Sequence, residues 1–167
     1  MSLLDEQLVE EWLNRQGFFT MRGIKCGVDE IDLLAVREQP EEIDRWHVEV
    51  QISFRPIGYI GGDTNARRRA PEQVRAGVEQ WVWKKFTQPL KAAKRQSILP
   101  NTQWDYVLVH AVARYPEELE IMRELGVRTI PYSEALSYLL NKGTKESSSL
   151  ASNILDIVAY AQSNVTR

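Results

Sequence analysis

Apolar residues in the first part of the chain recur at helical spacing. Leu4, Leu8 and Trp12 fall on one face when the segment is drawn as a helix. Acidic residues stand in the first turn, where the helix dipole favours them, and Gly17 ends the pattern. The sequence therefore predicts an amphipathic helix over residues 4–16.

A strict two-residue alternation follows further along, in residues 45–53. Trp46, Val48, Val50 and Ile52 alternate with polar residues, so one face of the predicted strand is apolar and the other polar. The nearly continuous apolar runs at 31–37 and 105–113 instead predict strands that are buried on both faces. A row of polar groups beside such buried strands needs a reason, because buried polar groups cost free energy unless they are paired.

The remaining periodicities complete an α/β domain. They predict strands over 18–25 and 127–130, helices over 71–86, 88–96, 117–125, 133–140 and 150–162, a Gly-rich connection over 55–70 and a polar linker over 142–149. This order predicts a mixed central sheet flanked by helices. A length of 167 residues suits one domain, predicted over 1–142, with the linker and final helix (143–167) packed on the same domain or on a partner.

Composition narrows the class of protein. The chain is 43% hydrophobic and 26% charged, and no apolar run reaches the ~20 residues that span a bilayer. The start of the chain is acidic, and Cys26 is the single cysteine, so no internal disulfide can form. We therefore expect a cytoplasmic protein without a membrane partner.

Charge is distributed unevenly along the chain. The net charge is −2, yet residues 65–95 hold nine Lys or Arg and two Glu, which gives +7 there and −9 elsewhere. Such a segment either forms an ordinary solvated helix surface or attracts a polyanion to one face. Arg67, Arg68 and Arg69 precede a predicted helix N-terminus, which itself favours phosphate. The candidate nucleic-acid contacts are Arg67, Arg68, Arg69, Arg75, Lys84 and Lys85.

Two carboxylates carry the candidate chemistry. If the strands over 31–37 and 45–53 pair as a hairpin, Asp32 and Glu49 meet on one sheet face, with Gln51 beside Glu49. Carboxylates brought close in a partly buried place repel each other unless a proton or a cation lies between them. Mg²⁺ suits this position, because it binds one or two carboxylates together with water and phosphate.

Three short segments resemble the PD-(D/E)xK nuclease superfamily, and within it the small Holliday-junction-resolvase-like proteins. Glu6 lies on a first helix that ends before Gly17-Phe18, residues 30–35 (EIDLLA) resemble the strand of the motif aspartate, and residues 48–51 (VEVQ) resemble the apolar-Glu-x-Lys strand. The resemblance covers roughly residues 4–53 and implies a restriction-endonuclease-like fold.

The resemblance also implies roles for these residues. Asp32, Glu49 and the backbone carbonyl of Val50 would ligate Mg²⁺, for which Mn²⁺ can substitute. Glu6 would ligate through water or orient the metal shell, and Gln51 would position the attacking water. The departure is glutamine in place of lysine, because an amide brings no positive charge to the transition state. A second metal ion, Lys25 or Arg55 are the candidates to supply that charge. Gln73 is the candidate for a helix glutamine that faces the metal in some relatives.

The sequence thus predicts a Mg²⁺-dependent DNA endonuclease, expected to act as a homodimer through the apolar final helix. The alternative is a nuclease-fold DNA-binding or assembly module without catalysis, as the missing lysine permits, and a third reading is a protein-interaction domain. His47 is expected to bond locally, and His110 to be a satisfied core histidine.

Overall fold

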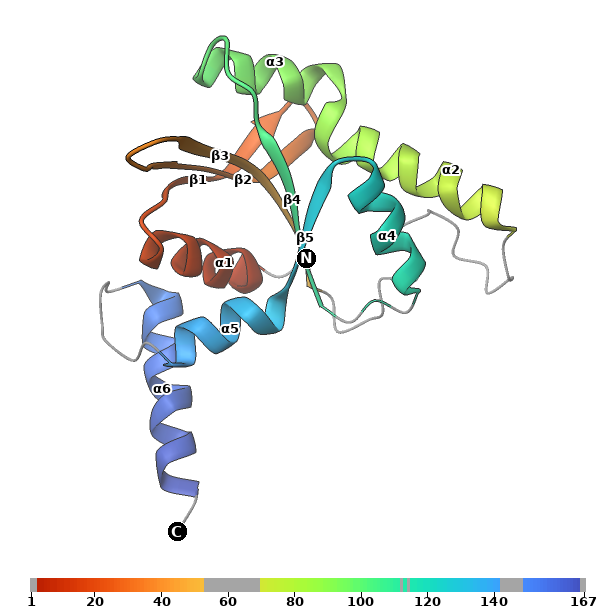
Figure 1. Ribbon diagram of the computed structural model, residues 1–167. Helices are drawn as coiled ribbons and strands as arrows, with labels where there is room; N and C mark the ends of the chain where they lie inside the picture. The colour runs from red at the N-terminus through yellow and green to blue at the C-terminus, as the bar shows by residue number, and fades with distance from the viewer. Residues whose placement is uncertain (1–2, 53–69, 112, 114, 142–148, 166–167) are drawn as a thin grey trace.

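The computed structural model describes residues 3–52, 70–111, 113, 115–141 and 149–165. Its sheet has five strands in the order β1-β2-β3-β4-β5 (Figure 1). The strands are β1 (Phe19–Cys26), β2 (Asp29–Glu38), β3 (Ile43–Gln51), β4 (Asp105–His110) and β5 (Val127–Pro131). β1, β2 and β3 pair antiparallel, whereas β3–β4 and β4–β5 pair parallel, so the predicted mixed sheet is confirmed.

Helices cover both faces of this sheet. They are α1 (Leu3–Arg15), α2 (Pro71–Val82), the π-helical turn η1 (Trp83–Thr87), α3 (Pro89–Ile98), α4 (Pro116–Glu124), α5 (Tyr132–Asn141) and α6 (Leu150–Val165). One core joins α1, α5 and the start of α6 to the apolar face of β3, through Val48 and Val50. A second core joins α2, η1 and α4 to the other face, through Val78, Phe86 and Leu108.

The predicted elements all occur, most of them with ends within two residues of the predicted ones, and three of them differ by more. The helix predicted over 71–86 is divided, because α2 gives way to η1 at Trp83. The strand predicted over 105–113 ends at His110, where the ladder to β3 and β5 ends. The final helix runs on to Val165. The predicted Gly-rich connection and polar linker lie outside the described residues, except for Ala70 and Ser149.

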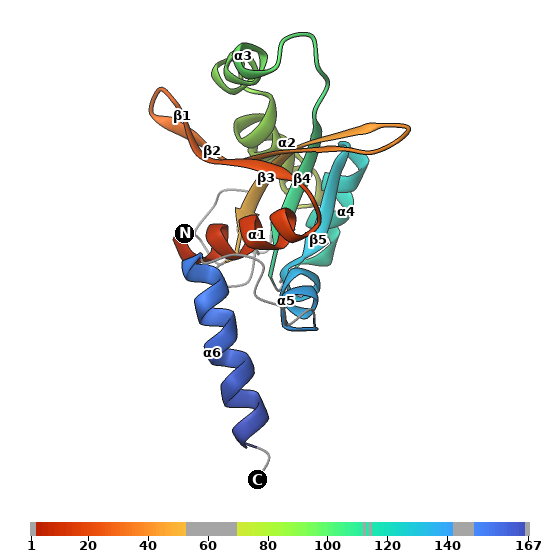
Figure 2. The ribbon, with the colours of Figure 1, turned by 90° about the vertical axis from the view of Figure 1, so that its left-hand side faces the viewer.

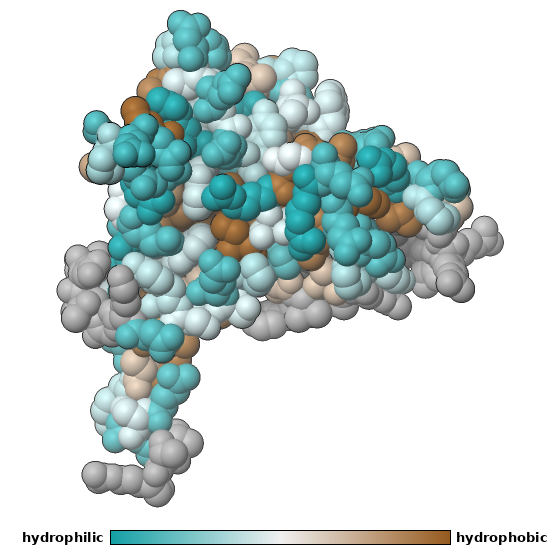
Figure 3. Space-filling model, viewed as in Figure 1, coloured by the Kyte–Doolittle hydropathy of each residue, from teal (hydrophilic) through white to brown (hydrophobic). Residues whose placement is uncertain are grey.

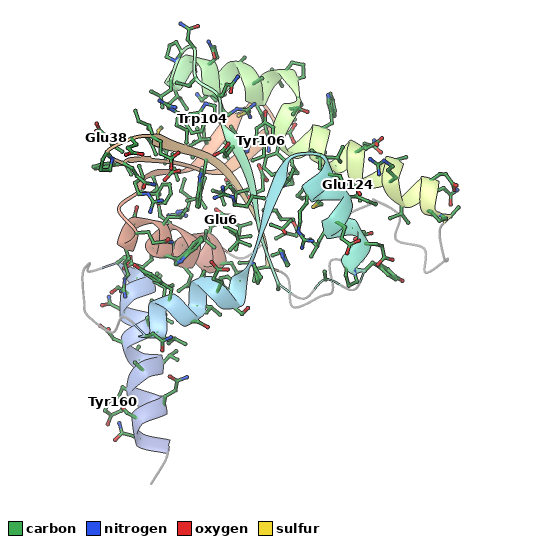
Figure 4. All side chains as sticks on the ribbon, in the orientation of Figure 1. Glu6, Glu38, Trp104, Tyr106, Glu124 and Tyr160 are labelled. Atoms are coloured by element: carbon green, nitrogen blue, oxygen red, sulfur yellow. The ribbon has the colours of Figure 1, made fainter. Side chains whose placement is uncertain are left out.

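The last helix projects away from the sheet in both views (Figures 1 and 2). Its first turns pack on the domain, because Ala151 and Leu155 are buried in the first core. Beyond Leu155 it is exposed, and Ile157 and Tyr160 are 67% and 71% accessible. Tyr160 points away from the domain in Figure 4. Among the described residues, no helix is both long and apolar enough to cross a membrane.

Candidate active site

The hairpin of β2 and β3 brings the two carboxylates to one face. Leu34 pairs with His47, and Leu33 with Val48, in the antiparallel register. Asp32 and Glu49 each lie one residue beyond the Leu33–Val48 pair, on the same side as Leu34 and His47. The geometric prediction is therefore confirmed. Both side chains are buried, with accessibilities of 3% for Asp32 and 1% for Glu49.

Asp32 has a pKa close to neutral pH, so its side chain holds a proton more readily than an ordinary aspartate does. Its Oδ2 accepts a hydrogen bond of 2.8 Å from the backbone N–H of Val50. Burial raises the pKa of Asp32 to about 7, and the charges of Glu49 and Glu6 add to this rise. The positive charge of Lys85 and the Val50 hydrogen bond act in the opposite direction without cancelling the rise.

Glu49 is instead held as a carboxylate. Lys85 Nζ donates to its Oε2 at 2.8 Å, and Lys91 Nζ donates to its Oε1 at 2.7 Å. His47 Nε2 lies 3.1 Å from the same Oε1. Burial alone would raise the pKa of Glu49, but the hydrogen bond from His47 and the charges of the lysines lower it to about 2. The two carboxylates thus have opposite protonation preferences on the same sheet face.

His47 is oriented by Arg95. Arg95 Nη1 lies 2.8 Å from His47 Nδ1, and a guanidinium can only donate, so Nδ1 accepts. The proton of the neutral ring then resides on Nε2, which donates to Glu49. Burial lowers the pKa of His47 to about 4, so the ring is neutral at pH 7. The expected local hydrogen bond of His47 is therefore found, and it fixes the orientation of Glu49.

Glu6 approaches the same region from α1. Its side chain is buried, and α1 lies against the sheet (Figure 4). Burial raises the pKa of Glu6, and the charges of Glu30 and Glu49 raise it further, whereas Arg22 lowers it. The charges of Glu6, Asp32 and Glu49 are therefore close enough to act on one another.

This donor set suits Mg²⁺ better than zinc. Within the described ranges, no three His, Cys, Asp or Glu side chains lie close enough to form a metal cluster. Structural zinc sites need four protein ligands, and catalytic ones need three. Mg²⁺ instead keeps water and phosphate ligands around one or two carboxylates, which Asp32 and Glu49 can supply. Lys85 contacts one oxygen of Glu49, and Lys91 and His47 contact the other, so an ion bound by Glu49 would displace or share one of these contacts.

Gln51 and one of the two candidate replacements for the motif lysine lie among the described residues. Gln51 ends β3 on the Glu49 face and pairs in register with His110, whose buried Nδ1 donates to the carbonyl of Ala111. Lys25 was a candidate replacement; its side chain is 77% exposed and pairs with Glu30. Arg55, the other candidate, lies outside the described residues.

Three basic residues of the segment 65–95 point into the protein instead of forming an exposed basic surface. Lys85, Lys91 and Arg95 turn inward and bind Glu49 and His47, which the charge pattern alone did not predict. One signal was present: the helix over residues 88–96 has few apolar residues, so some of its polar side chains are expected to face the protein interior, and the structure shows that these are Lys91 and Arg95. Part of the +7 charge therefore neutralises the site internally.

The remaining candidate residues that the structure describes are exposed or form contacts elsewhere. Gln73 caps α2, because its Oε1 accepts from the backbone N–H of Ala70, and its exposed side chain does not face the carboxylates. Arg75 pairs with Glu79 and with Glu124 of α4. Lys84 is exposed. Figure 3 shows a largely hydrophilic surface over α2 and α3. Arg67, Arg68 and Arg69 lie outside the described residues.

Comparisons with other proteins give little beyond the fold. No protein-family model matches the chain, and no curated protein matches it. The chain is similar to one solved structure, described as "Crystal Structure of Protein of Unknown Function AF1548", with a TM-score of 0.49 and 17% identity over 84% of this chain and 67% of that one. This likeness is too distant to carry an argument. The described residues define a mixed α/β protein with a buried carboxylate pair on its central hairpin.

Proposed function

We propose that this protein is a Mg²⁺-dependent DNA endonuclease of the PD-(D/E)xK type. The observation that carries the proposal is the pair Asp32 and Glu49, buried on one face of adjacent strands and opposed in protonation. Such a pair, with a raised pKa on one member, is typical of functional sites. The motif resemblance and the approach of Glu6 support the same assignment.

The reaction is hydrolysis of a phosphodiester. The oxygen of water bonds to phosphorus while the bond from phosphorus to the leaving oxygen breaks, and the proton lost by water is balanced by the one gained by the leaving oxygen. Asp32 and Glu49 would hold Mg²⁺, which when bound lowers the pKa of water and stabilises phosphate charge. Val50 orients Asp32 through its N–H, His47 orients Glu49, and Gln51 would hydrogen-bond the attacking water.

DNA is the proposed substrate because the acidic remainder of the chain contrasts with the basic segment. The backbone phosphates of DNA would be held by Lys84, Arg67, Arg68 and Arg69. Replacing Arg67 and Arg68 with Ala should weaken DNA binding and flatten its dependence on salt concentration. An unchanged slope would remove these residues from the interface.

Plasmid nicking tests the function. Supercoiled plasmid is incubated with wild-type protein in Mg²⁺ or Mn²⁺, beside Asp32→Asn and Glu49→Gln. Asp44→Asn is the matched control, because Asp44 is a carboxylate of the same hairpin bonded to Arg37, away from the pair. We expect nicking by wild type and control alone. DNA retardation without nicking would favour the non-catalytic binding module, and absence of both would exclude a DNA function.

We further propose that two copies pair through α6. Ile154, Val158 and Ala161 recur at spacings of four and three, which suits a seam between two helices. Residues 157–165 contain no charged side chain, so identical helices would not repel each other. Light scattering after gel filtration should give twice the mass of one chain. Val158→Glu should give the monomer mass, while Ser163→Glu, on the opposite side of the helix, should not.

A further inference from the structure

The strand position that carries lysine in the resembling nucleases is Gln51 here, so the positive charge must come from elsewhere. Two lysines contact Glu49, one on each oxygen. They differ in access, because the side chain of Lys91 is 2% exposed and that of Lys85 is 23% exposed. Lys91 is therefore sealed inside the fold, whereas Lys85 is partly accessible to solvent.

The backbone at Lys85 has an unusual conformation. Lys85 lies in the π-helical turn η1, between α2 and α3. Turns of this kind are rare and frequently occur at functional sites. Phe86, which is fully buried, anchors the turn by stacking on Tyr106 at 5.0 Å and by meeting the edge of His47 at 4.9 Å. The ammonium of Lys85 is thus held 2.8 Å from Glu49 by a packed support.

We propose that Lys85, contributed by the π-helical turn, is the catalytic lysine of this site and takes the place of the lysine absent at Gln51. Without a bound cation, its ammonium neutralises Glu49. With a cation held by Asp32 and Glu49, the same ammonium would be free to donate to the attacking water or to a non-bridging phosphate oxygen, where its positive charge would stabilise the developing negative charge. This inference rests on the proposed nuclease function.

A set of variants tests the assignment by activity. Lys85→Met keeps the aliphatic stem and removes the charge, and Lys94→Met on α3 is the matched control, because Lys94 belongs to neither the candidate catalytic residues nor the candidate DNA contacts. Loss of one charge-stabilising donor lowers kcat by roughly 100-fold to 1,000-fold. We expect that loss for Lys85→Met and no comparable loss for Lys94→Met. Adding Gln51→Lys to Lys85→Met should restore at least about tenfold of the rate, because the charge returns from the strand side.

A binding measurement tests it independently of turnover. Lys85 competes with a cation for Glu49, so Lys85→Met should bind Mn²⁺ more tightly, by roughly tenfold in titration calorimetry, which corresponds to about 1.4 kcal/mol. Tighter Mn²⁺ binding shows that the ammonium and the cation compete for Glu49, whereas the loss of kcat and its rescue by Gln51→Lys report the catalytic role. Opposite signs of the two effects, slower nicking with tighter Mn²⁺ binding, are the expected signature.

The outcomes separate this inference from the function on which it rests. Loss of nicking in Asp32→Asn and Glu49→Gln, with full nicking in Lys85→Met, would overturn the role of Lys85 and leave the nuclease standing. Slow nicking by Lys85→Met without rescue by Gln51→Lys and with weaker Mn²⁺ binding would also overturn it. No nicking by the wild-type protein would overturn both.

Discussion

The raised pKa of Asp32 makes a quantitative prediction for the metal-free protein. Folding moves this pKa from 3.8 to about 7. Each unit is worth 1.36 kcal/mol, so ionised Asp32 costs the folded state about 4 kcal/mol in order of magnitude. The folded state holds the proton more tightly. This cost is therefore absent below about pH 4, grows as the pH rises, and is complete above about pH 7.

Asp32→Asn removes the titration but keeps an oxygen that can accept from Val50. In EDTA, the variant should exceed wild type in free energy of unfolding by about 4 kcal/mol at pH 8 and by about 2 kcal/mol at pH 5. The difference between the two pH values is the diagnostic quantity, because other effects of the amide do not depend on pH. Urea unfolding followed by circular dichroism measures it.

Asp44→Asn should show the opposite dependence of stability on pH. Burial pulls the pKa of Asp44 upward, but hydrogen bonds from Arg37 and Gln39 outweigh it and leave the pKa below its ordinary value. Its contribution to stability is therefore present at neutral pH and lost in acid. Equal stability differences for Asp32→Asn at pH 5 and pH 8 would refute the opposed protonation of Asp32 and Glu49.

Three further outcomes follow from the same structure. Lys91→Ala should destabilise the fold by about 3 kcal/mol in urea unfolding, because Glu49 loses a partner inside the protein; Lys94→Ala, on the same helix, is the control, and equal effects would contradict the inward role of Lys91. Phe86→Ala should cost about 3 to 5 kcal/mol in the same assay, since it empties a packed site, and a cost below about 1 kcal/mol would show that the site collapses. Mg²⁺ at ten times its Kd should add about 1.4 kcal/mol to wild-type stability. Because Asp32 must lose its proton, the Kd should fall about tenfold from pH 6 to pH 8, and a Kd independent of pH would exclude Asp32 as a ligand.

Much of the fold could be predicted from periodicity because its signals are local. The alternation in β3 determined which residues share a face, and this placed Asp32 and Glu49 together once the hairpin formed. The change from α-helix to π-helical turn at Trp83 could not be predicted from local periodicity. It depends on Phe86 reaching Tyr106 and His47, a contact between segments that lie far apart in sequence.

The sequence pattern placed the acidic residues of the candidate site on one sheet face, but it did not predict that two lysines contact Glu49. Acidic residues on strands lie near their strand neighbours, so their spacing is informative. Lys85 and Lys91 reach Glu49 from a helical segment more than thirty residues away, and sequence gives no direct measure of that approach. Gln73 was misplaced for a related reason, because a glutamine at a helix start caps the helix as readily as it faces a site.

Because η1 is a π-helical turn, the number of residues in this segment determines whether the side chain of Lys85 faces Glu49. A residue removed from an ordinary helix rotates everything after it by about 100°. Deleting one residue near Trp83 would restore a regular helical repeat and turn the ammonium of Lys85 away from Glu49, while the sheet and both terminal helices kept their sequences. Gain or loss of this one residue would therefore make or break the Lys85–Glu49 contact within the same scaffold.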